Sequence, residues 1–228
     1  MTKDPDKYLT IEKSSEGLFK DRGSKFIAYL HPCQSPTHFS ESLEKVKSLH
    51  FKARHHCFAY KLIDENQFRY SDDGEPGGTA GKPIYNQLLS SGIVNASCIV
   101  VRYFGGTKLG TSGLINAYKE AAKDAIANNV IITKYHEEII DISFDYAVMG
   151  QLMNELKYLN INIRDKTLDA NPVINIGIRR SEVEHTINKI KARLLNRPVE
   201  DISPDTKVDG VSFLIREKPM PDQIDFGT

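Results

Sequence analysis

The second half of the chain repeats two patterns of apolar positions, one with a strand-like and one with a helix-like period. Apolar and polar residues alternate over residues 140–144, which is typical of a half-buried strand. Asp145 then offers a carboxylate N-cap to a helix whose apolar side chains recur on one face over residues 149–159. Alternation returns over residues 161–163 and 174–178, and the turn between them predicts a hairpin.

A second helix and a last strand complete this half. Ser181 and Glu184 have the spacing of a capping box, ahead of a helix over residues 183–194. Residues 211–215 alternate once more. The resulting order, βαββαβ, is that of the ferredoxin-like arrangement, with two helices on one face of a sheet. We therefore predict a ferredoxin-like C-terminal domain over residues 136–217.

The first half also mixes strands and helices, with less regular spacing. Ser35 and Pro36 predict the start of one helix, and Gly92 suits the end of another. The predicted strands cover residues 8–18, 25–30, 57–63, 67–71 and 96–103, and the predicted helices cover residues 35–49, 83–92 and 114–128. We interpret this half as an α+β domain over residues 1–134, and we predict a disordered tail at residues 218–228.

The composition is that of an ordinary globular protein, with 40% hydrophobic and 26% charged residues. Residues 1–10 lack the apolar core of a signal peptide, and the longest strongly apolar run, residues 98–101, is too short to cross a membrane. Cys33, Cys57 and Cys98 form no Cys-x-x-Cys pair, so we expect buried free thiols without a catalytic role. These features predict a cytoplasmic protein without a membrane span.

Charge is unevenly divided along the chain. The 30 Lys and Arg residues balance the 30 Asp and Glu residues overall. Up to Tyr135 there are 18 basic against 14 acidic residues, and from His136 onward there are 12 against 16. This asymmetry supports two domains and allows a basic face on the first.

Three segments of the first half carry candidate chemistry, and the first is Arg54-His55-His56. These residues stand at the entrance to a strand, where neighbouring side chains point to opposite faces and do not easily share one ligand. Anion binding led by Arg54 is one interpretation, and a hydrogen-bonded structural role for the histidines is another. A metal site is the least favoured reading, and we assign neither a metal nor a cofactor.

The second segment, residues 71–83, places Asp72, Asp73 and Glu75 before a glycine-rich loop and a helix start. It is not a P-loop, because prolines stand where that motif needs a glycine and a Ser or Thr. Loop N–H groups, the helix N-terminus and Lys82 form one candidate anion site. Alternatively, the glycines serve only turns while the carboxylates pair with nearby arginines. The carboxylates are also a candidate acidic site for acid–base chemistry or magnesium.

The third segment, residues 100–114, is a buried strand that runs through Gly-Gly into a loop opening a helix. Its cations and hydroxyls suit an anion, and its aromatic rings suit stacking on a base or simple packing. The side chains concerned are those of Arg102, Tyr103, Phe104, Lys108, Thr111 and Ser112. Across the three segments the predicted anion or nucleic-acid contacts are Arg54, His55, His56, Lys82, Arg102, Tyr103, Gly105, Gly106, Lys108 and Gly110.

Together these segments resemble the signature of the YigZ/IMPACT family. The resemblance rests on Arg54-His55-His56-Cys57, on Asp72-Asp73-Gly74-Glu75-Pro76-x-Gly78-Thr79-Ala80-Gly81, and on Val100-Val101-Arg102-Tyr103-Phe104-Gly105-Gly106-x-x-Leu109-Gly110. It covers the N-terminal half, and the ferredoxin-like half is similar to the C-terminal domain of bacterial members. We expect the chain to lack the RWD domain that animal and fungal members carry.

The resemblance implies both a fold and a link to translation. It implies that the first domain has the ribosomal-protein second-domain-like fold, a four-stranded sheet with helices on one face, which elongation factor G also uses. Eukaryotic members act in translational control, so the resemblance also implies contact with RNA, the ribosome or a translation-associated protein.

We therefore favour a non-enzymatic binding protein whose glycine-rich basic face contacts RNA or an acidic partner. One alternative is an enzyme acting on a small phosphorylated or carboxylated substrate, with His55 or His56 as base and the acidic site as acid or metal ligand. Another is a protein-interaction adaptor that offers the exposed sheet face of its acidic second domain to a partner. The favoured reading assigns no catalytic residue.

Overall fold

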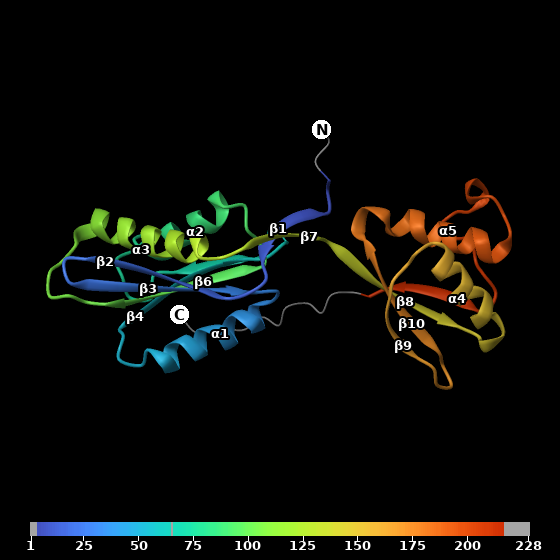
Figure 1. Cartoon of the computed structure of the whole chain (residues 1–228), viewed down its shortest axis with the longest axis horizontal. Helices are drawn as coiled ribbons and strands as arrows, with labels where there is room; N and C mark the ends of the chain where they lie inside the picture. Colours follow the sequence, from blue (N-terminus) through green and yellow to red (C-terminus); the bar gives the residue numbers. More distant parts are fainter. Residues whose placement is uncertain (1–3, 65, 217–228) are drawn as a thin grey trace. The chain divides into compact units, whose positions relative to one another are not determined.

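The computed structural model describes residues 4–64 and 66–216, which divide into two compact units (Figure 1). One unit is Tyr8–Lys134, and the other combines residues 4–7 with residues 135–216. The predicted tail at residues 218–228 lies outside the described residues. Among the helices that the structure describes, none is both long and apolar enough to cross a membrane.

The first unit is built on a five-stranded antiparallel sheet. Its strands, in spatial order, are β2 (Ser15–Asp21), β3 (Ser24–Pro32), β6 (Ala96–Tyr103), β4 (His55–Lys61) and β5 (Phe68–Ser71). The central strand β6 is buried on both faces, which explains why its sequence reads as a nearly continuous apolar run.

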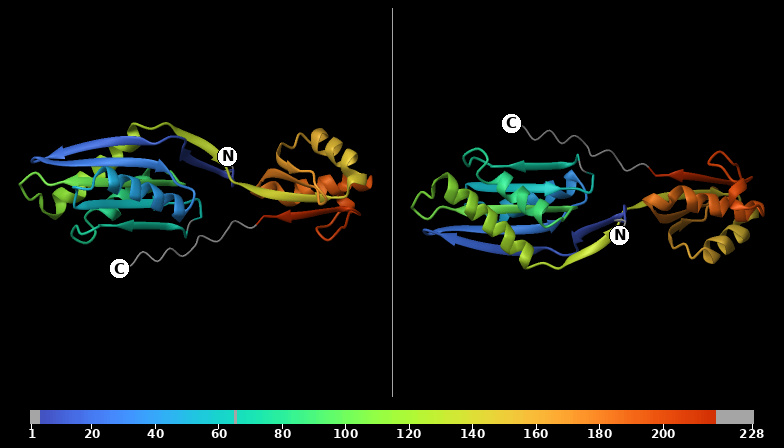
Figure 2. Two further views of the ribbon diagram at one scale, coloured as in Figure 1. Left: turned by 90° about the horizontal axis from the view of Figure 1, so that it is seen from below. Right: turned by 90° about the horizontal axis from the view of Figure 1, so that it is seen from above.

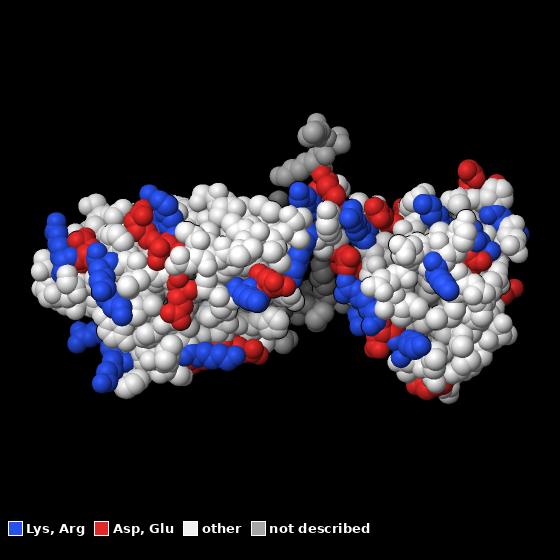
Figure 3. Space-filling model, in the orientation of Figure 1, with Lys and Arg blue, Asp and Glu red and all other residues white. Residues whose placement is uncertain are grey.

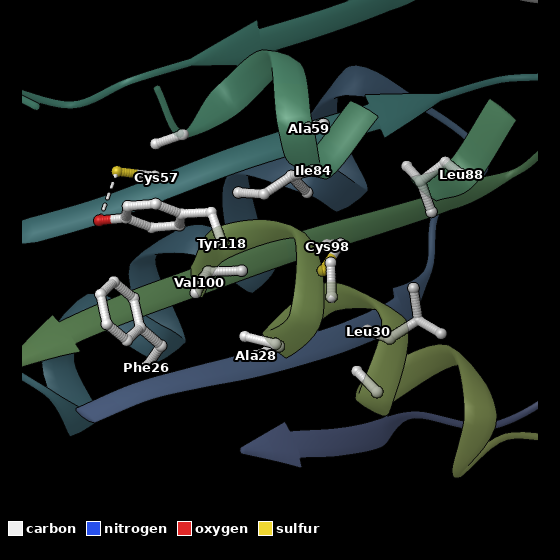
Figure 4. Close-up of a cluster of buried hydrophobic side chains, with 14 of the residues drawn as sticks. Phe26, Ala28, Leu30, Cys57, Ala59, Ile84, Leu88, Cys98, Val100 and Tyr118 are labelled. Atoms are coloured by element: carbon white, nitrogen blue, oxygen red, sulfur yellow. Dashed lines mark hydrogen bonds between the residues drawn. The ribbon is translucent and has the colours of Figure 1, made fainter. Parts of the chain in front are cut away.

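Helices cover both faces of this sheet, as Figure 1 shows. α2 (Gly81–Ser90) and α3 (Gly110–Ala127) pack on one face, and α1 (Pro36–Leu49) packs on the other. Figure 4 shows the core beneath α2 and α3, where the rings of Phe26 and Tyr118 meet edge to face at 5.1 Å.

The mixed α/β class is confirmed, and two details of the first unit correct the prediction. The sheet has five strands, and its helices do not all lie on one face. Phe39 of α1 packs against Phe58 and Tyr60 of β4, with ring centroids 4.5 and 4.9 Å apart. Because β4 and β6 carry apolar side chains on both faces, each face needs a covering layer.

The strand predicted over residues 8–18 is two strands in the structure. β1 (Lys7–Ile11) pairs with β7 (Ile131–Tyr135) in a separate two-stranded sheet, and β2 begins only at Ser15. The polar residues 12–14 interrupt the alternation, which allows the chain to change sheets there.

The second unit has the predicted ferredoxin-like order βαββαβ. Its elements are β8 (Glu137–Phe144), α4 (Met149–Tyr158), β9 (Ile163–Thr167), β10 (Val173–Arg179), α5 (Val183–Leu195) and β11 (Val211–Ile215). The sheet order is β11-β8-β10-β9, with antiparallel pairing throughout. The alternating isoleucines of β8 and β10 point into one core under the two helices, as their period of two requires.

Both predicted helix caps of this unit are wrong. Asp145 makes no capping hydrogen bond, and a 3₁₀ turn, Tyr146–Val148, separates it from α4. Ser181 likewise lies in a 3₁₀ turn and does not cap α5. Its hydroxyl donates to Oδ2 of Asp6 at 2.5 Å, so it is hydrogen-bonded to a residue near the start of the chain and not to the helix.

Candidate functional site

The three predicted segments meet at one end of the five-stranded sheet. Strand register decides this, because Asp21 pairs with Ser24, Lys25 with Tyr103, Arg102 with His55, and Phe58 with Ser71. The turn between β2 and β3, the start of β4, the loop after β5 and the loop after β6 therefore lie at the same end. We call this region the sheet end.

Asp72 closes the N-terminus of α2 from within the protein. Its carboxylate accepts hydrogen bonds from the backbone N–H groups of Gly78, Ala80 and Gly81, at 2.8, 2.9 and 2.9 Å. A Cβ at Gly81 would stand 2.7 Å from the backbone of Ser71, so only glycine allows this approach. The candidate anion position at the start of α2 is thus held by the protein's own carboxylate.

Asp73 follows β5 and continues the hydrogen bonding to β4 through its side chain. Its Oδ2 accepts the backbone N–H of His56 at 2.6 Å, and its carbonyl accepts Nδ1–H of His55 at 2.8 Å. Asp73 adopts a positive φ of 40°, which Asp tolerates better than most residues. Burial lowers the pKa of His56, which favours the neutral ring.

Glu75 and Arg102 form an ion pair inside the sheet end. Nη1 of Arg102 lies 2.6 and 2.9 Å from the two carboxylate oxygens, and the hydroxyl of Tyr118 donates to Oε1 at 2.8 Å. The Arg102 guanidinium also lies over the rings of Phe26 and Phe104, at 5.5 and 5.6 Å. Arg102 is 8% exposed, so this predicted anion contact already has an internal counter-ion.

Cys57 joins the same buried network. Its sulfur lies 2.9 Å from the carbonyl oxygen of Asp72 and 3.3 Å from the hydroxyl of Tyr118, a contact drawn in Figure 4. Burial raises the pKa of the Cys57 thiol and that of the Tyr118 hydroxyl far above their ordinary values. Both groups are therefore neutral hydrogen-bonding groups, and the prediction of a buried free thiol is confirmed for Cys57.

Tyr103 packs instead of standing free for stacking. Its hydroxyl is hydrogen-bonded to Nδ1 of His50 at 2.9 Å, and Nε2 of His50 is bonded to the hydroxyl of Tyr29 at 2.6 Å. Burial lowers the pKa of His50. This Tyr–His–Tyr chain ties the end of α1 to β3 and β6, and sequence reasoning missed it because its members are far apart in the chain.

The exposed charge of the sheet end is mostly basic, with Asp73 as an exposed carboxylate among the cations. Of the predicted contacts, Arg54, Lys82 and Lys108 are exposed there. Three further exposed cations were not predicted: Arg22, Lys25 and Lys52. We call these six residues the basic end, and Figure 3 shows Lys and Arg side chains around this part of the first unit. No local sequence pattern predicted that Arg22, Lys25 and Lys52 belong to this surface, because their position at the sheet end depends on strand register.

The predicted glycines divide into two kinds. A Cβ at Gly105 would stand 1.9 Å from the backbone of Gly23, so Gly105 lets two loops pack together. Gly106 and Gly110 have φ values of 90° and 74°, and nothing lies within 4 Å of a Cβ built on either. Their backbones are open to a ligand.

The candidate acidic site does not form a free carboxylate cluster. Asp72, Asp73 and Glu75 each face a different internal partner, as described above. Within the described parts of the chain, no three or more His, Cys, Asp or Glu side chains are grouped to hold a metal ion.

Comparison with known proteins identifies relatives of this chain. Residues 22–126 match the family model of the Impact N-terminal domain. The IMPACT family member YvyE of Bacillus subtilis is 34% identical over 66% of this chain and 70% of its own length. The IMPACT family member YigZ of Escherichia coli is 42% identical over 45% of this chain and 52% of its own. A crystal structure of a hypothetical protein shares 26% identity and a TM-score of 0.67, over 93% of this chain and 98% of that one.

Proposed function

The chain belongs to the IMPACT family, as its three motifs predicted, and from this membership we propose that it is a non-enzymatic binding protein linked to translation. It contacts RNA phosphates through the basic end, in the cytoplasm. The link to translation comes from the family resemblance, whereas the choice of RNA as ligand comes from the chemistry of the sheet end.

One observation carries the choice of an anionic ligand. All six side chains of the basic end are exposed, and across the described residues none of them forms an ion pair. The nearby carboxylates of Asp72 and Glu75 are turned inward to backbone N–H groups and to Arg102. The basic end therefore lacks internal counter-ions and attracts a polyanion.

Backbone geometry next to the cations supports phosphate as the group bound. Gly106 and Gly110 leave open space beside Lys108, and α3 starts at Gly110 without a side-chain cap. Uncapped N–H groups at a helix N-terminus and a flexible Lys together suit a phosphate oxygen. Arg102 is not part of this proposed surface, because its guanidinium is paired with Glu75.

No observation favours the two alternative functions. In the predicted acid–base site, the Asp73 carboxylate accepts the backbone N–H of His56, and the His55 ring bonds to the backbone carbonyl of Asp73, so neither bond joins a histidine ring to a carboxylate. On the exposed face of the second sheet, the carboxylate of Asp141 is bonded to Arg216 at 2.8 Å, so this face offers a paired charge and not a free acidic one.

Binding of the purified full chain to ribosomal RNA, followed by fluorescence anisotropy over a range of KCl concentrations, tests the proposal. We expect the logarithm of the binding constant to fall linearly with the logarithm of salt, by about 0.7–0.9 per phosphate contacted. Lys108→Glu and Arg54→Glu should each weaken binding and reduce the slope.

Lys13→Glu is the matched control. Lys13 is also exposed, but it lies just before the first residue of β2, whereas the sheet end lies at the last residue of that strand, Asp21. Equal weakening by Lys13→Glu, or binding that ignores salt, would contradict a localised phosphate surface. Polyglutamate that displaces the labelled RNA at lower concentrations than unlabelled RNA does would show that an acidic protein is the better ligand.

A further inference from the structure

The two most exposed phenylalanine rings among the described residues lie at the sheet end. Phe51 comes two residues after α1 and is 76% exposed, and Phe104 comes directly after β6 and is 59% exposed. The residues before them, His50 and Tyr103, are joined by the hydrogen bond of 2.9 Å. A single exposed apolar side chain is ordinary on a protein surface, but two exposed rings at the end that also gathers the cations indicate a common ligand.

Phe104 is held in place from inside the protein. Arg102 lies over the ring, with its guanidinium carbon 5.6 Å from the ring centroid, and Arg102 is 8% exposed. Its bonds to both carboxylate oxygens of Glu75 fix the guanidinium. One face of the ring therefore rests on a fixed cation, while most of the ring stays open to solvent. A ring that is ordered before its ligand arrives loses little conformational freedom on binding.

Exposed cations lie close to Phe104. A Cβ at Gly105 would stand 1.9 Å from the backbone of Gly23, so the loop after β6 packs on the turn between β2 and β3. Figure 2 shows this turn and this loop side by side. Arg22 is exposed in the turn, and Lys108 is exposed in the loop. A nucleic-acid strand that crosses the Phe104 ring therefore has cations within reach of its phosphates.

Phe51 also has cations beside it. Nζ of Lys52 lies 5.6 Å from the centroid of the Phe51 ring, and Arg54 follows just before β4. Lys25 lies at the same end of the sheet, because it pairs with Tyr103. Each exposed ring of the sheet end is thus accompanied by exposed cations.

Rings beside cations suit unpaired bases better than a duplex. In a duplex the faces of the bases are stacked on one another, so a protein contacts phosphates, riboses and base edges. In a single strand the base faces are free to stack on aromatic side chains while Lys and Arg hold the phosphates. Cations alone suffice for a duplex, whereas the rings of Phe51 and Phe104 add contacts that only unpaired bases use.

We propose that the basic end binds single-stranded RNA, with unpaired bases stacked on Phe51 and Phe104 and neighbouring phosphates held by Lys52 and Lys108. This inference rests on the proposed function and names the class of RNA. Stacking tolerates any base, because every base has an aromatic face. The basic end therefore distinguishes a single strand from a duplex, and not one sequence from another.

Three labelled RNAs of about twelve nucleotides separate stacking from charge. They are an oligouridylate, the same strand paired with oligoadenylate, and a strand of abasic sites with the same number of phosphates. Binding to the full chain is followed by fluorescence anisotropy at one KCl concentration and then over a range. We expect the oligouridylate to bind about fivefold or more tightly than the abasic strand, because the abasic strand has no base to stack.

Leucine at either ring position removes the aromatic face and keeps an apolar side chain. Phe51→Leu and Phe104→Leu should each weaken the oligouridylate about fivefold or more and leave the abasic strand and the duplex unchanged. The salt slope should stay the same, since no phosphate contact is lost. Phe51→Tyr and Phe104→Tyr keep a ring and should bind as the native chain does.

Tyr158→Leu is the matched control. Tyr158 belongs to α4 of the second unit, is 71% exposed and has Arg193 over its ring at 3.7 Å, so it is also an exposed ring with a cation beside it. This variant should leave the affinity for all three RNAs unchanged. Weakening equal to that of Phe104→Leu would overturn stacking at the sheet end.

The same measurements distinguish failure of this inference from failure of the proposed function. Equal affinities for the oligouridylate and the abasic strand, with leucine variants that bind like the native chain, would overturn stacking. If Lys108→Glu still weakened binding, the phosphate surface would stand without it. Absence of binding to all three RNAs would overturn both.

Discussion

Arg102 and Glu75 lie 27 positions apart in the chain, and the structure joins them in a buried ion pair with nitrogen–oxygen distances of 2.6 and 2.9 Å. The side chains are 9% and 3% exposed, and Tyr118 donates a further hydrogen bond to the carboxylate. A pair so removed from water is sensitive to the loss of one partner, because the other charge is then left buried alone.

Glu75→Ala should therefore destabilise the first unit strongly. We expect the free energy of unfolding to fall by about 3–5 kcal/mol, because Arg102 loses its counter-ion. Urea unfolding followed by circular dichroism measures this change. Lys82→Ala is the control, since Lys82 is exposed and makes no ion pair in the described residues. A loss as small as that of the control would mean that the pair opens easily to solvent.

Asp72→Ala should loosen the glycine-rich loop and the start of α2. The substitution removes the acceptor of three backbone N–H groups, at an expected cost of about 1–2 kcal/mol in unfolding free energy. Hydrogen exchange at Gly78, Ala80 and Gly81 should accelerate. The exposed Glu41 on α1 provides a comparison, because Glu41→Ala should leave these amides unchanged.

Stability of the first unit should fall as the pH drops below the ordinary histidine value of 6.5. Burial lowers the pKa of His31, His50 and His56, so the folded chain resists protonation while the unfolded chain takes up protons. The stabilisation is complete above pH 6.5 and is lost on the acid side. Urea unfolding at pH 7.5 and pH 5.5 tests this, and His50→Asn should flatten the dependence.

Asp6 should add to the free energy of unfolding, and this contribution should be lost at a lower pH than that of the histidines. Burial by itself raises the pKa of Asp6, but hydrogen bonds from the hydroxyl and N–H of Ser181 outweigh burial and hold the pKa below its ordinary value of 3.8. The folded form is favoured above pH 3.8, and this contribution disappears as pH falls through the lowered pKa. The difference in unfolding free energy between the native chain and Asp6→Asn should shrink across that range. Ser181→Ala should reduce the same difference at neutral pH.

Local patterns in the sequence sufficed for most elements. Strand β6 was predicted with its observed bounds, and the order of the second unit was predicted in full. β6 was recognised by its nearly continuous apolar run, because it is buried on both faces. The elements of the second unit were recognised by periodicity, because a half-buried strand or helix shows its buried face in every second or every third to fourth residue. The three motifs likewise sufficed to identify the family.

Tertiary structure alone decided which charged residues are available at the surface. Arg102 and Lys108 look equivalent in the sequence, yet one is buried against Glu75 and the other is exposed. The difference arises from a strand order, β2-β3-β6-β4-β5, that brings the loop after β5 under the end of β6. Ser181 shows the same principle. Its spacing to Glu184 predicts a helix cap, yet its hydroxyl bonds to Asp6, which lies 175 positions away in the chain. Such side-chain pairs form between segments that are distant in the chain, and a local sequence pattern does not show which distant residue will lie next to a given side chain.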